Sequence, residues 1–156
     1  MEREEGIRQS LISNFAFLDG KITIPRERRI FLETPQEEFL NVIRFINDNL
    51  KFNQMLTITG LDLGEVLQFV YHTAQDDGIV LNLKINVDRE NPVIQTITDI
   101  YPNSILYERE LEDMLGAKVE GLPPGERYPL PEDWPEGQYP LRKDWTPDQL
   151  EESKEG

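Results

Sequence analysis

The sequence predicts an α+β domain: a mixed, largely antiparallel sheet with helices packed on one face, followed by an extended proline-rich C-terminal tail. Three observations lead to this fold class. Apolar and polar residues alternate over three segments between residues 54 and 87, the period of half-buried strands. Apolar residues recur every three or four positions before and after those segments, the period of amphipathic helices. Seven of the eleven prolines lie after residue 116, where they oppose regular structure.

The first part of the chain is expected to form one helix and two short strands. Residues 4–18 carry the helical period, and Asp19-Gly20 marks the turn after them. Residues 21–24 and 28–33 are the strands, and they are joined at Pro25-Arg26-Glu27. The buried face of the helix is expected to comprise Ile7, Leu11, Phe15 and Leu18.

A second helix is predicted to begin at Thr34. Thr34 has the side chain of an N-cap, Pro35 suits the first helical position, and Glu37 completes a capping box. Its buried stripe is expected to comprise Phe39, Ile43, Ile46 and Leu50.

Three longer strands follow, over residues 54–61, 65–74 and 79–87. Each has one polar face, which predicts an antiparallel sheet with one solvated side. Asp77-Gly78 is a hairpin signal between the last two strands. The residues predicted to point inward are Leu56, Ile58, Leu67, Phe69, Tyr71, Leu81, Leu83, Ile85 and Val87; Asn82, Lys84 and Asn86 are predicted to point outward.

The body is predicted to close with a helix over residues 103–115. Before it, Asn91-Pro92 suggests an irregular helical region, and residues 96–99 resemble a second capping box. Gly116 stands where a helix that ends in a left-handed residue needs glycine. The apolar stripe comprises Tyr107, Leu111, Met114 and Leu115, and Glu108, Arg109, Glu110, Glu112 and Asp113 are assigned to the other faces.

These elements divide the chain into a body over residues 1–116 and a tail over residues 117–156. The tail is expected to pack on partner subunits, because its tyrosines and tryptophans lie on a stiff, proline-rich backbone and such side chains often anchor interfaces. The alternative is that these aromatic side chains pack back on their own domain.

Composition excludes several classes of function. Thirty acidic and 16 basic residues give a net charge of −14, which disfavours binding to nucleic acid or to anionic membranes. The absence of cysteine excludes disulfides and Cys-ligated zinc or iron–sulfur clusters. No apolar run is long enough to cross a bilayer, and the charged residues 1–5 are not followed by a signal-peptide core. No cofactor, no metal and no direct membrane insertion are therefore expected.

The sequence supplies no evident reaction centre. His72 is the only histidine, and its place in a strand favours a structural or surface role. Glu108 and Glu112 lie four residues apart on one helix, but in so acidic a chain we interpret them as solvent-facing. No catalytic residue is assigned.

The second half of the chain resembles the thirty-kilodalton subunit family of respiratory complex I and related membrane-bound energy-converting hydrogenases. The resemblance covers residues 56–145. Its motifs are Thr98-Asp99-Ile100-Tyr101-Pro102, Tyr107-Glu108-Arg109-Glu110, Asp113 with Leu115-Gly116, Pro131-Glu132-Asp133-Trp134 and Tyr139-Pro140-Leu141-Arg142-Lys143-Asp144-Trp145. The region after Gly116 departs from the complex I pattern, since it lacks the histidine of a Gly-His-Pro-Asp-Leu-Arg-Arg run and keeps Arg127 alone.

The resemblance implies a non-catalytic subunit of the hydrophilic arm, without a cofactor. Its expected partners are the large, hydrogenase-like subunit and the cluster-bearing small subunit, and its expected location is peripheral, on the cytoplasmic side of the cell membrane. The residues expected at the partner interface are Tyr107, Glu108, Arg109, Glu110, Asp113, Arg127, Trp134, Tyr139, Arg142, Lys143, Asp144 and Trp145.

The altered loop after Gly116 favours a membrane-bound [NiFe]-hydrogenase or related ferredoxin-linked complex. Two alternatives stay open: the thirty-kilodalton subunit of an NADH-quinone oxidoreductase, and a stand-alone hydrolase that uses carboxylates such as Glu108 and Glu110. A free adaptor that binds one large-subunit-like partner outside any membrane complex is a further possibility.

Overall fold

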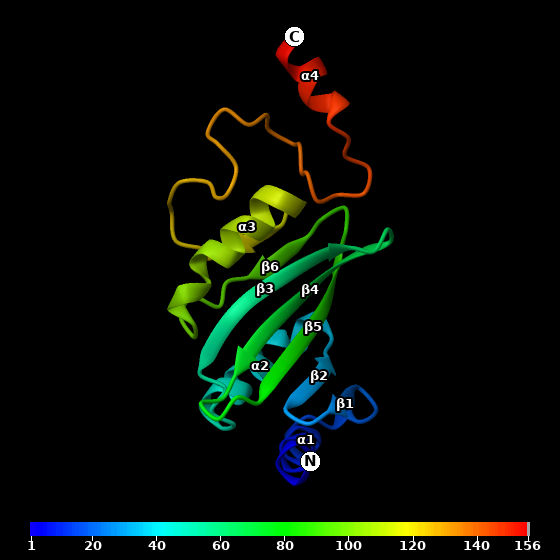
Figure 1. Cartoon of the computed structure of the whole chain (residues 1–156), viewed down its shortest axis with the longest axis vertical. Helices are drawn as coiled ribbons and strands as arrows, with labels where there is room; N and C mark the ends of the chain where they lie inside the picture. The colour runs from blue at the N-terminus through cyan, green and yellow to red at the C-terminus, as the bar shows by residue number, and fades with distance from the viewer. Residues whose placement is uncertain (156) are drawn as a thin grey trace.

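The computed structural model describes residues 1–155, without the side chain of residue 155; the last residue of the predicted tail, Gly156, lies outside it (Figure 1). The elements, in order, are α1 (Glu2–Asn14), η1 (Ala16–Leu18), β1 (Ile22–Arg26), β2 (Arg29–Glu33), η2 (Gln36–Glu38), α2 (Phe39–Asp48), β3 (Gln54–Asp62), β4 (Val66–Ala74), β5 (Val80–Asp88), β6 (Val93–Gln95), η3 (Pro102–Ser104), α3 (Ile105–Leu115), β7 (Lys118–Glu120) and α4 (Asp148–Glu155).

The central sheet has five strands in the order β1-β2-β5-β4-β3. The β1–β2, β5–β4 and β4–β3 pairs are antiparallel, whereas β2 and β5 are parallel. This confirms the predicted mixed, largely antiparallel sheet. The parallel pair arises because the chain leaves β2, passes through α2 and the β3–β4 hairpin, and returns beside β2.

Helices α2 and α3 pack against one face of this sheet (Figure 1). The hydrophobic core lies between this face and the helices. On α2, Phe39, Val42, Ile43 and Ile46 are buried, and the Phe39 ring lies 4.6 Å from the Tyr71 ring on β4, measured between centroids. The predicted inward residues of β4 and β5 are buried as expected. Alternation along these strands therefore identifies the core face correctly.

The helix ends in the first half differ from those predicted. Helix α1 stops at Asn14 because Phe15 has extended backbone angles, and η1 carries Leu18 into the core as a separate turn. Thr34 does not cap a helix. Its hydroxyl donates to the Pro35 carbonyl, residues 36–38 form a 3₁₀ turn, and α2 starts only at Phe39.

One predicted side-chain direction in the sheet is wrong, and one residue on the outer face is buried. A register shift between Met55 and Thr57 adds one residue to β3, so Met55 and Ile58 are buried and Leu56 is 44% exposed. Such a bulge changes which residues face the core. Asn82 lies on the predicted outer face but is 5% exposed, because its amide donates to the Ile30 carbonyl and its oxygen lies 2.5 Å from Nδ1 of His72.

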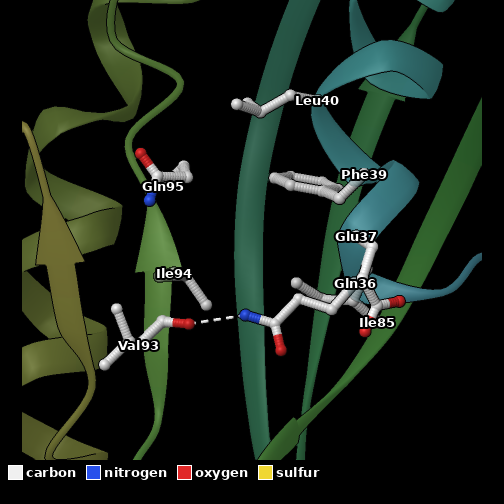
Figure 2. Close-up of a pocket in the computed structure, with 8 residues that line it drawn as sticks. All are labelled: Gln36, Glu37, Phe39, Leu40, Ile85, Val93, Ile94 and Gln95. Atoms are coloured by element: carbon white, nitrogen blue, oxygen red, sulfur yellow. Dashed lines mark hydrogen bonds between the residues drawn. The ribbon is translucent and has the colours of Figure 1, made fainter.

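The region expected to be irregular and helical contains strand β6, which pairs in parallel with β7. The tail was expected to lack strands and helices from Ala117 onward, yet β7 and α4 both fall within it. The predicted division at Gly116 thus groups β7 with the tail, although β7 pairs with a strand of the body. Between β6 and the start of α2 lies a groove of about 260 Å³ (Figure 2).

Helix α3 reaches β3 at a glycine. A Cβ atom on Gly60 would lie 2.2 Å from Cδ1 of Leu115 and 2.9 Å from Cδ2 of Leu111. Both distances are shorter than a carbon–carbon contact allows. At the other end of the contact, the Asn103 side chain donates to the Met55 carbonyl at 2.9 Å. The helix can therefore lie on the strand only because residue 60 has no side chain.

Gly60→Val should lower the free energy of unfolding by about 1–3 kcal/mol, because overpacking a close contact displaces both leucines. Urea unfolding followed by circular dichroism measures the change. Gly6→Ala is the control: a Cβ there meets nothing within 4 Å, and replacing a mid-helix glycine should stabilise the fold by about 0.5–1 kcal/mol. Equal stability of wild type and Gly60→Val would contradict the close contact.

Candidate partner-binding surface on helix α3 and the C-terminal tail

Glu108 lies inside the protein, contrary to the prediction that it faces solvent. Its side chain is fully buried, and Oε1 accepts hydrogen bonds from the Thr96 hydroxyl, the Ile97 amide and the Ser104 hydroxyl at 2.9, 3.3 and 3.2 Å. Within residues 1–155, neither Oε2 of Glu108 nor the buried hydroxyl of Tyr71 has a hydrogen-bond partner. Burial raises the pKa of the Glu108 carboxyl, against the lowering effect of its donors.

Arg109 projects toward the loop that follows β7 and holds it. Its guanidinium donates to the carbonyls of Pro123 and Glu126 at 2.8 and 2.9 Å. Gly125 lies directly against it, since a Cβ there would fall 1.8 Å from an Arg109 nitrogen. The face of α3 that carries Arg109 is therefore covered by the chain's own tail.

Asp113 and Arg127 form the second contact between α3 and the tail. The Arg127 guanidinium lies 3.2 Å from Oδ1 of Asp113, and it also donates to the Trp134 carbonyl at 3.1 Å. The Leu130 amide donates to Oδ2 of Asp113 at 3.1 Å. Asp113 is 7% exposed, so this predicted interface residue is already covered within the chain.

The third contact lies where α3 ends. Gly116 has a φ of 78°, the left-handed conformation predicted for it, and the Tyr139 ring occupies the space a Cβ would need. Arg142 donates to the Leu115 carbonyl at 2.6 Å, and its guanidinium lies 5.7 Å from the centroid of the Tyr139 ring. A cation at the carbonyl end of a helix is stabilised by the helix dipole.

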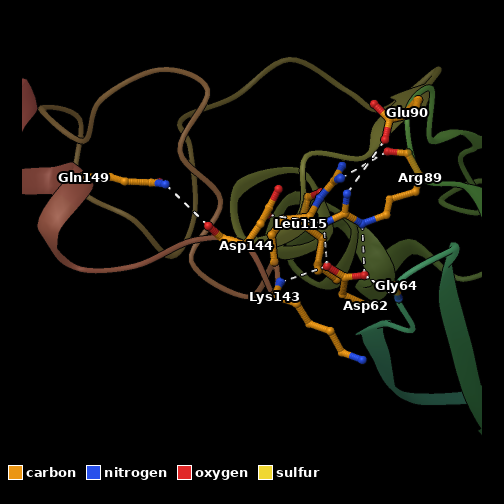
Figure 3. Close-up of polar contacts among 9 residues, drawn as sticks. Asp62, Gly64, Arg89, Glu90, Leu115, Lys143, Asp144 and Gln149 are labelled. Carbon is orange, nitrogen blue, oxygen red and sulfur yellow. Dashed lines mark hydrogen bonds and ion pairs between the residues drawn. The ribbon is translucent and has the colours of Figure 1, made fainter.

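A fourth contact centres on Asp62, at the end of β3 (Figure 3). Nε and Nη2 of Arg89 donate to its two oxygens at 3.1 and 3.0 Å, and the amides of Gly64 and Lys143 donate at 2.9 and 2.8 Å. The Asp62 side chain is only 1% exposed. The hydrogen bonds from Arg89, with those from the two amides, hold the pKa of the Asp62 carboxyl well below its usual range.

The two tryptophans of the tail pack on each other. Their ring centroids are 5.9 Å apart, and both indole nitrogens donate to Gln138: Trp134 to its carbonyl and Trp145 to its side-chain oxygen. Both rings stay half-buried. They form a compact turn of the tail that leaves part of each ring accessible.

The structure thus brings most of the predicted interface residues to one region, where α3 meets the tail. Two of them face elsewhere: Glu108 is buried in the core, and Tyr107 packs against the core from a half-buried position. Glu110 is half-exposed. Asp62 and Arg89 were not predicted. The only local signal for Asp62 is its place two residues before Gly64, the spacing of an aspartate that accepts from the amide two positions on.

No grouping suited to metal binding, meaning three or more histidine, aspartate or glutamate side chains together, occurs in the part of the chain that the structure describes. None of the helices described over residues 1–155 is long and apolar enough to span a membrane. A hydrolytic role for Glu108 conflicts with its complete burial, since a substrate in solution could not reach its carboxylate.

The family model for the respiratory-chain NADH dehydrogenase 30 kDa subunit matches residues 32–151. This match includes β3 to β5, α3 and almost all of the tail. The chain belongs to this family. The resemblance in the motifs of α3 and the tail is therefore confirmed over a longer segment than the motifs themselves cover.

Relatives of this 30 kDa subunit family occur in several enzymes. The chain is 32% identical to the membrane-bound hydrogenase subunit beta of Pyrococcus furiosus over 113 residues, which are 70% of this chain and 65% of that protein. It is 40% identical to the C subunit of an NADH-quinone oxidoreductase of Roseiflexus over 104 residues, 63% and 60% of the two chains. It is 30% identical to the C subunit of the F(420)H(2) dehydrogenase of Methanosarcina mazei over 136 residues, 83% and 86% of the two.

The first two of these relatives are thus matched over just under two thirds of their own length. Among solved structures, a chain of the membrane-bound sulfane sulfur reductase, an archaeal respiratory membrane complex, superposes with a TM-score of 0.84 at 26% identity over 97% of this chain and 90% of that one. A trypsin-resistant fragment of Nqo5 superposes with a TM-score of 0.66 over 79% and 99% of the two chains; at 23% identity, this shows the fold alone.

The buried carboxyl of Glu108 should make the stability of the protein depend on pH. The folded protein binds the Glu108 proton more tightly than the unfolded chain does, because the pKa of this carboxyl is raised in the fold. Its contribution to the free energy of unfolding is therefore largest below the unfolded-state pKa of about 4.3, and it falls as the pH rises through the raised pKa. Glu108→Gln keeps an oxygen acceptor and cannot ionise, so it should lose this fall. The stability of the wild type minus that of the variant should therefore decrease as pH rises.

Urea unfolding of both proteins between pH 4 and 8 measures this difference. Glu110→Gln, on the same helix and half-exposed, controls for the loss of one helix carboxylate. A constant difference between wild type and Glu108→Gln across the range would show that the fold does not raise the pKa of Glu108.

Asp62→Asn should lower the free energy of unfolding by about 3 kcal/mol, because it leaves the Arg89 guanidinium without its buried counter-ion. It should also loosen the tail at Lys143, where trypsin cleavage would accelerate. Asp144→Asn is the matched control: this carboxylate also pairs with Arg89 but is 74% exposed, so its loss should cost less than about 1 kcal/mol. Equal effects of the two substitutions would contradict the central place of Asp62.

Proposed function

We propose that this chain is a non-catalytic subunit of the peripheral, hydrophilic arm of a complex-I-like membrane-bound oxidoreductase. The family match over residues 32–151 carries the proposal, because it includes most of the body, from the end of β2 onward, and most of the tail. Relatives named as subunits of a hydrogenase, an F(420)H(2) dehydrogenase, an NADH-quinone oxidoreductase and a sulfane sulfur reductase support it. The chain's own part is structural: it carries no cofactor and connects other subunits.

The proposed partners are the large, hydrogenase-like subunit and the cluster-bearing small subunit, with the assembly on the cytoplasmic side of the membrane. The proposed contact surface is α3 together with the tail over residues 117–156. Three large apolar or aromatic side chains on this surface are exposed, which supports a role in contacts: Leu106 is 48% exposed, Tyr128 43% and Leu141 49%. Tyr128 and Leu141 belong to the same tail as the half-buried rings of Trp134 and Trp145. Accessible apolar and aromatic groups of this kind are typical of interface anchors.

A membrane-bound hydrogenase or related ferredoxin-linked complex is the proposed type of assembly. The likeness to the sulfane sulfur reductase chain, which extends over 97% of this chain and so includes the tail, supports it. The rival is an NADH-quinone oxidoreductase, which the 40% identity to the Roseiflexus protein favours. The electron donor and acceptor of the purified assembly would decide between the two.

A tagged copy of the chain, expressed in its own organism and extracted from membranes in mild detergent, should co-purify with a large and a cluster-bearing subunit. Arg109→Ala, which frees the loop at Pro123 and Glu126, and Trp145→Ala, which removes an aromatic anchor, should melt near the wild type yet recover less partner. Arg44→Ala, which removes only an exposed pair with Asp99, is the control. Recovery of the tagged chain alone, without partner subunits, would refute the proposed function.

A further inference from the structure

A second surface, separate from the contacts between α3 and the tail, has the features of a peptide-binding groove. It lies between β6 on one side and η2, α2 and β5 on the other (Figure 2), and it encloses about 260 Å³. Its lining residues are Gln36, Glu37, Phe39, Leu40, Ile85, Val93, Ile94 and Gln95. Phe39, Ile85 and Ile94 are buried core residues that form its apolar floor, whereas the amides and one carboxylate lie at its rim.

One wall of the groove is the free edge of β6. The Lys118 amide donates to the Pro92 carbonyl and the Thr96 amide donates to the Glu120 carbonyl. Residues 92 and 96 of this strand segment thus bond to β7, and Ile94, which pairs with Val119, lies midway between them. Because the N–H and C=O groups of alternate residues point to the same side of a strand, those of Ile94 also point toward β7. The N–H and C=O groups of Val93 and Gln95 therefore point away from β7, toward the groove.

These groups are only partly satisfied. The Val93 carbonyl accepts from Nε2 of Gln36 at 2.5 Å, and the Val93 amide donates to the Asn91 carbonyl. The backbone N–H and C=O of Gln95 have no hydrogen-bond partner within residues 1–155. The side-chain amide of Gln36 thus occupies the place where the backbone amide of an added strand would bind. The N–H and C=O groups of Gln95, the next ones along this edge, remain open to such a strand.

We propose that this groove binds an extended segment of a partner subunit as a third strand beside β6. Backbone pairing with Gln95 would set its direction, and one apolar side chain would rest on Phe39 and Ile85, as in other cases of strand addition. The identity of the partner rests on the proposed function; the mode of binding rests on the groove.

Charge selects the kind of segment. Glu37 lies at the rim, Glu38 follows it, and the whole chain carries a net charge of −14. A segment with lysine or arginine beside its apolar anchor therefore suits the site, and an acidic one does not. The same net charge opposes a second copy of this chain as the occupant.

Two matched pairs of variants test the groove through the co-purification described above. Leu40→Glu places a carboxylate in the groove, whereas Asn41→Glu places one on the neighbouring exposed position. Gln95→Pro removes the free N–H, whereas Gln95→Ala keeps it. Both substitutions lose the hydrogen bond from the Gln95 side chain to Glu120 on β7, so only the loss of the N–H separates the two variants. Leu40→Glu and Gln95→Pro should each reduce recovery of the partner subunits by about tenfold or more, and their controls should match the wild type.

Hydrogen–deuterium exchange gives a readout that does not depend on variants. The Gln95 amide should exchange more slowly in the assembled complex than in the free chain. Wild-type recovery by both groove variants, or unchanged exchange at Gln95 in an assembly that does form, overturns the groove and leaves the proposed function standing. Failure of the wild type to recover any subunit refutes both. A homodimer that Leu40→Glu dissociates would show that a second copy, and not a partner subunit, occupies the groove.

Discussion

The close approach of α3 to β3 at Gly60 determines how the second half of the chain is arranged. With Leu111 and Leu115 resting on a residue that has no side chain, the rotation of α3 about its axis is set. That rotation directs Glu108 into the core and Arg109 and Asp113 toward the tail. It also places the last carbonyls of the helix where Arg142 reaches them. The tail contacts are thus consequences of one helix–strand contact.

The tail is attached to the body at points of unequal strength. Asp62 is buried and accepts four hydrogen bonds, so the contact at Lys143 resists both solvent and salt. The Arg109 and Arg127 side chains are half-exposed, so water competes for their contacts with the loop more than it does at Asp62. Another protein bound to this face could therefore rearrange the loop between Leu122 and Leu130 more readily than the segment around Lys143. This unequal attachment suits a tail that is fixed to its own domain and still adapts to another chain.

The sequence was most informative where a period or a glycine determines the structure. The alternation in β4 and β5 and the left-handed residue at Gly116 follow from local rules, and both are present. The bulge at Leu56 could not be predicted, because one extra residue in a strand leaves no mark on composition. Glu108 was placed on the wrong face because its three hydrogen-bond donors come from residues 96–104, which only the fold brings to it. Arg89 and Asp62 are 27 residues apart and meet only through the sheet.

At Arg109 the loop after β7 is held through its main chain. Arg109 binds the carbonyl oxygens of Pro123 and Glu126, and every residue type supplies such an oxygen. Three positions are restricted: Gly121 by its left-handed backbone, Gly125 because the guanidinium fills the space its side chain would take, and Arg127 because its own side chain pairs with Asp113. Substitutions at the other positions of this loop can accumulate without releasing it from Arg109, so relatives can diverge there in sequence while their tails follow the same path. A loop that departs from the complex I pattern is then compatible with an unchanged architecture, and its sequence is free to adapt to whichever protein lies against it.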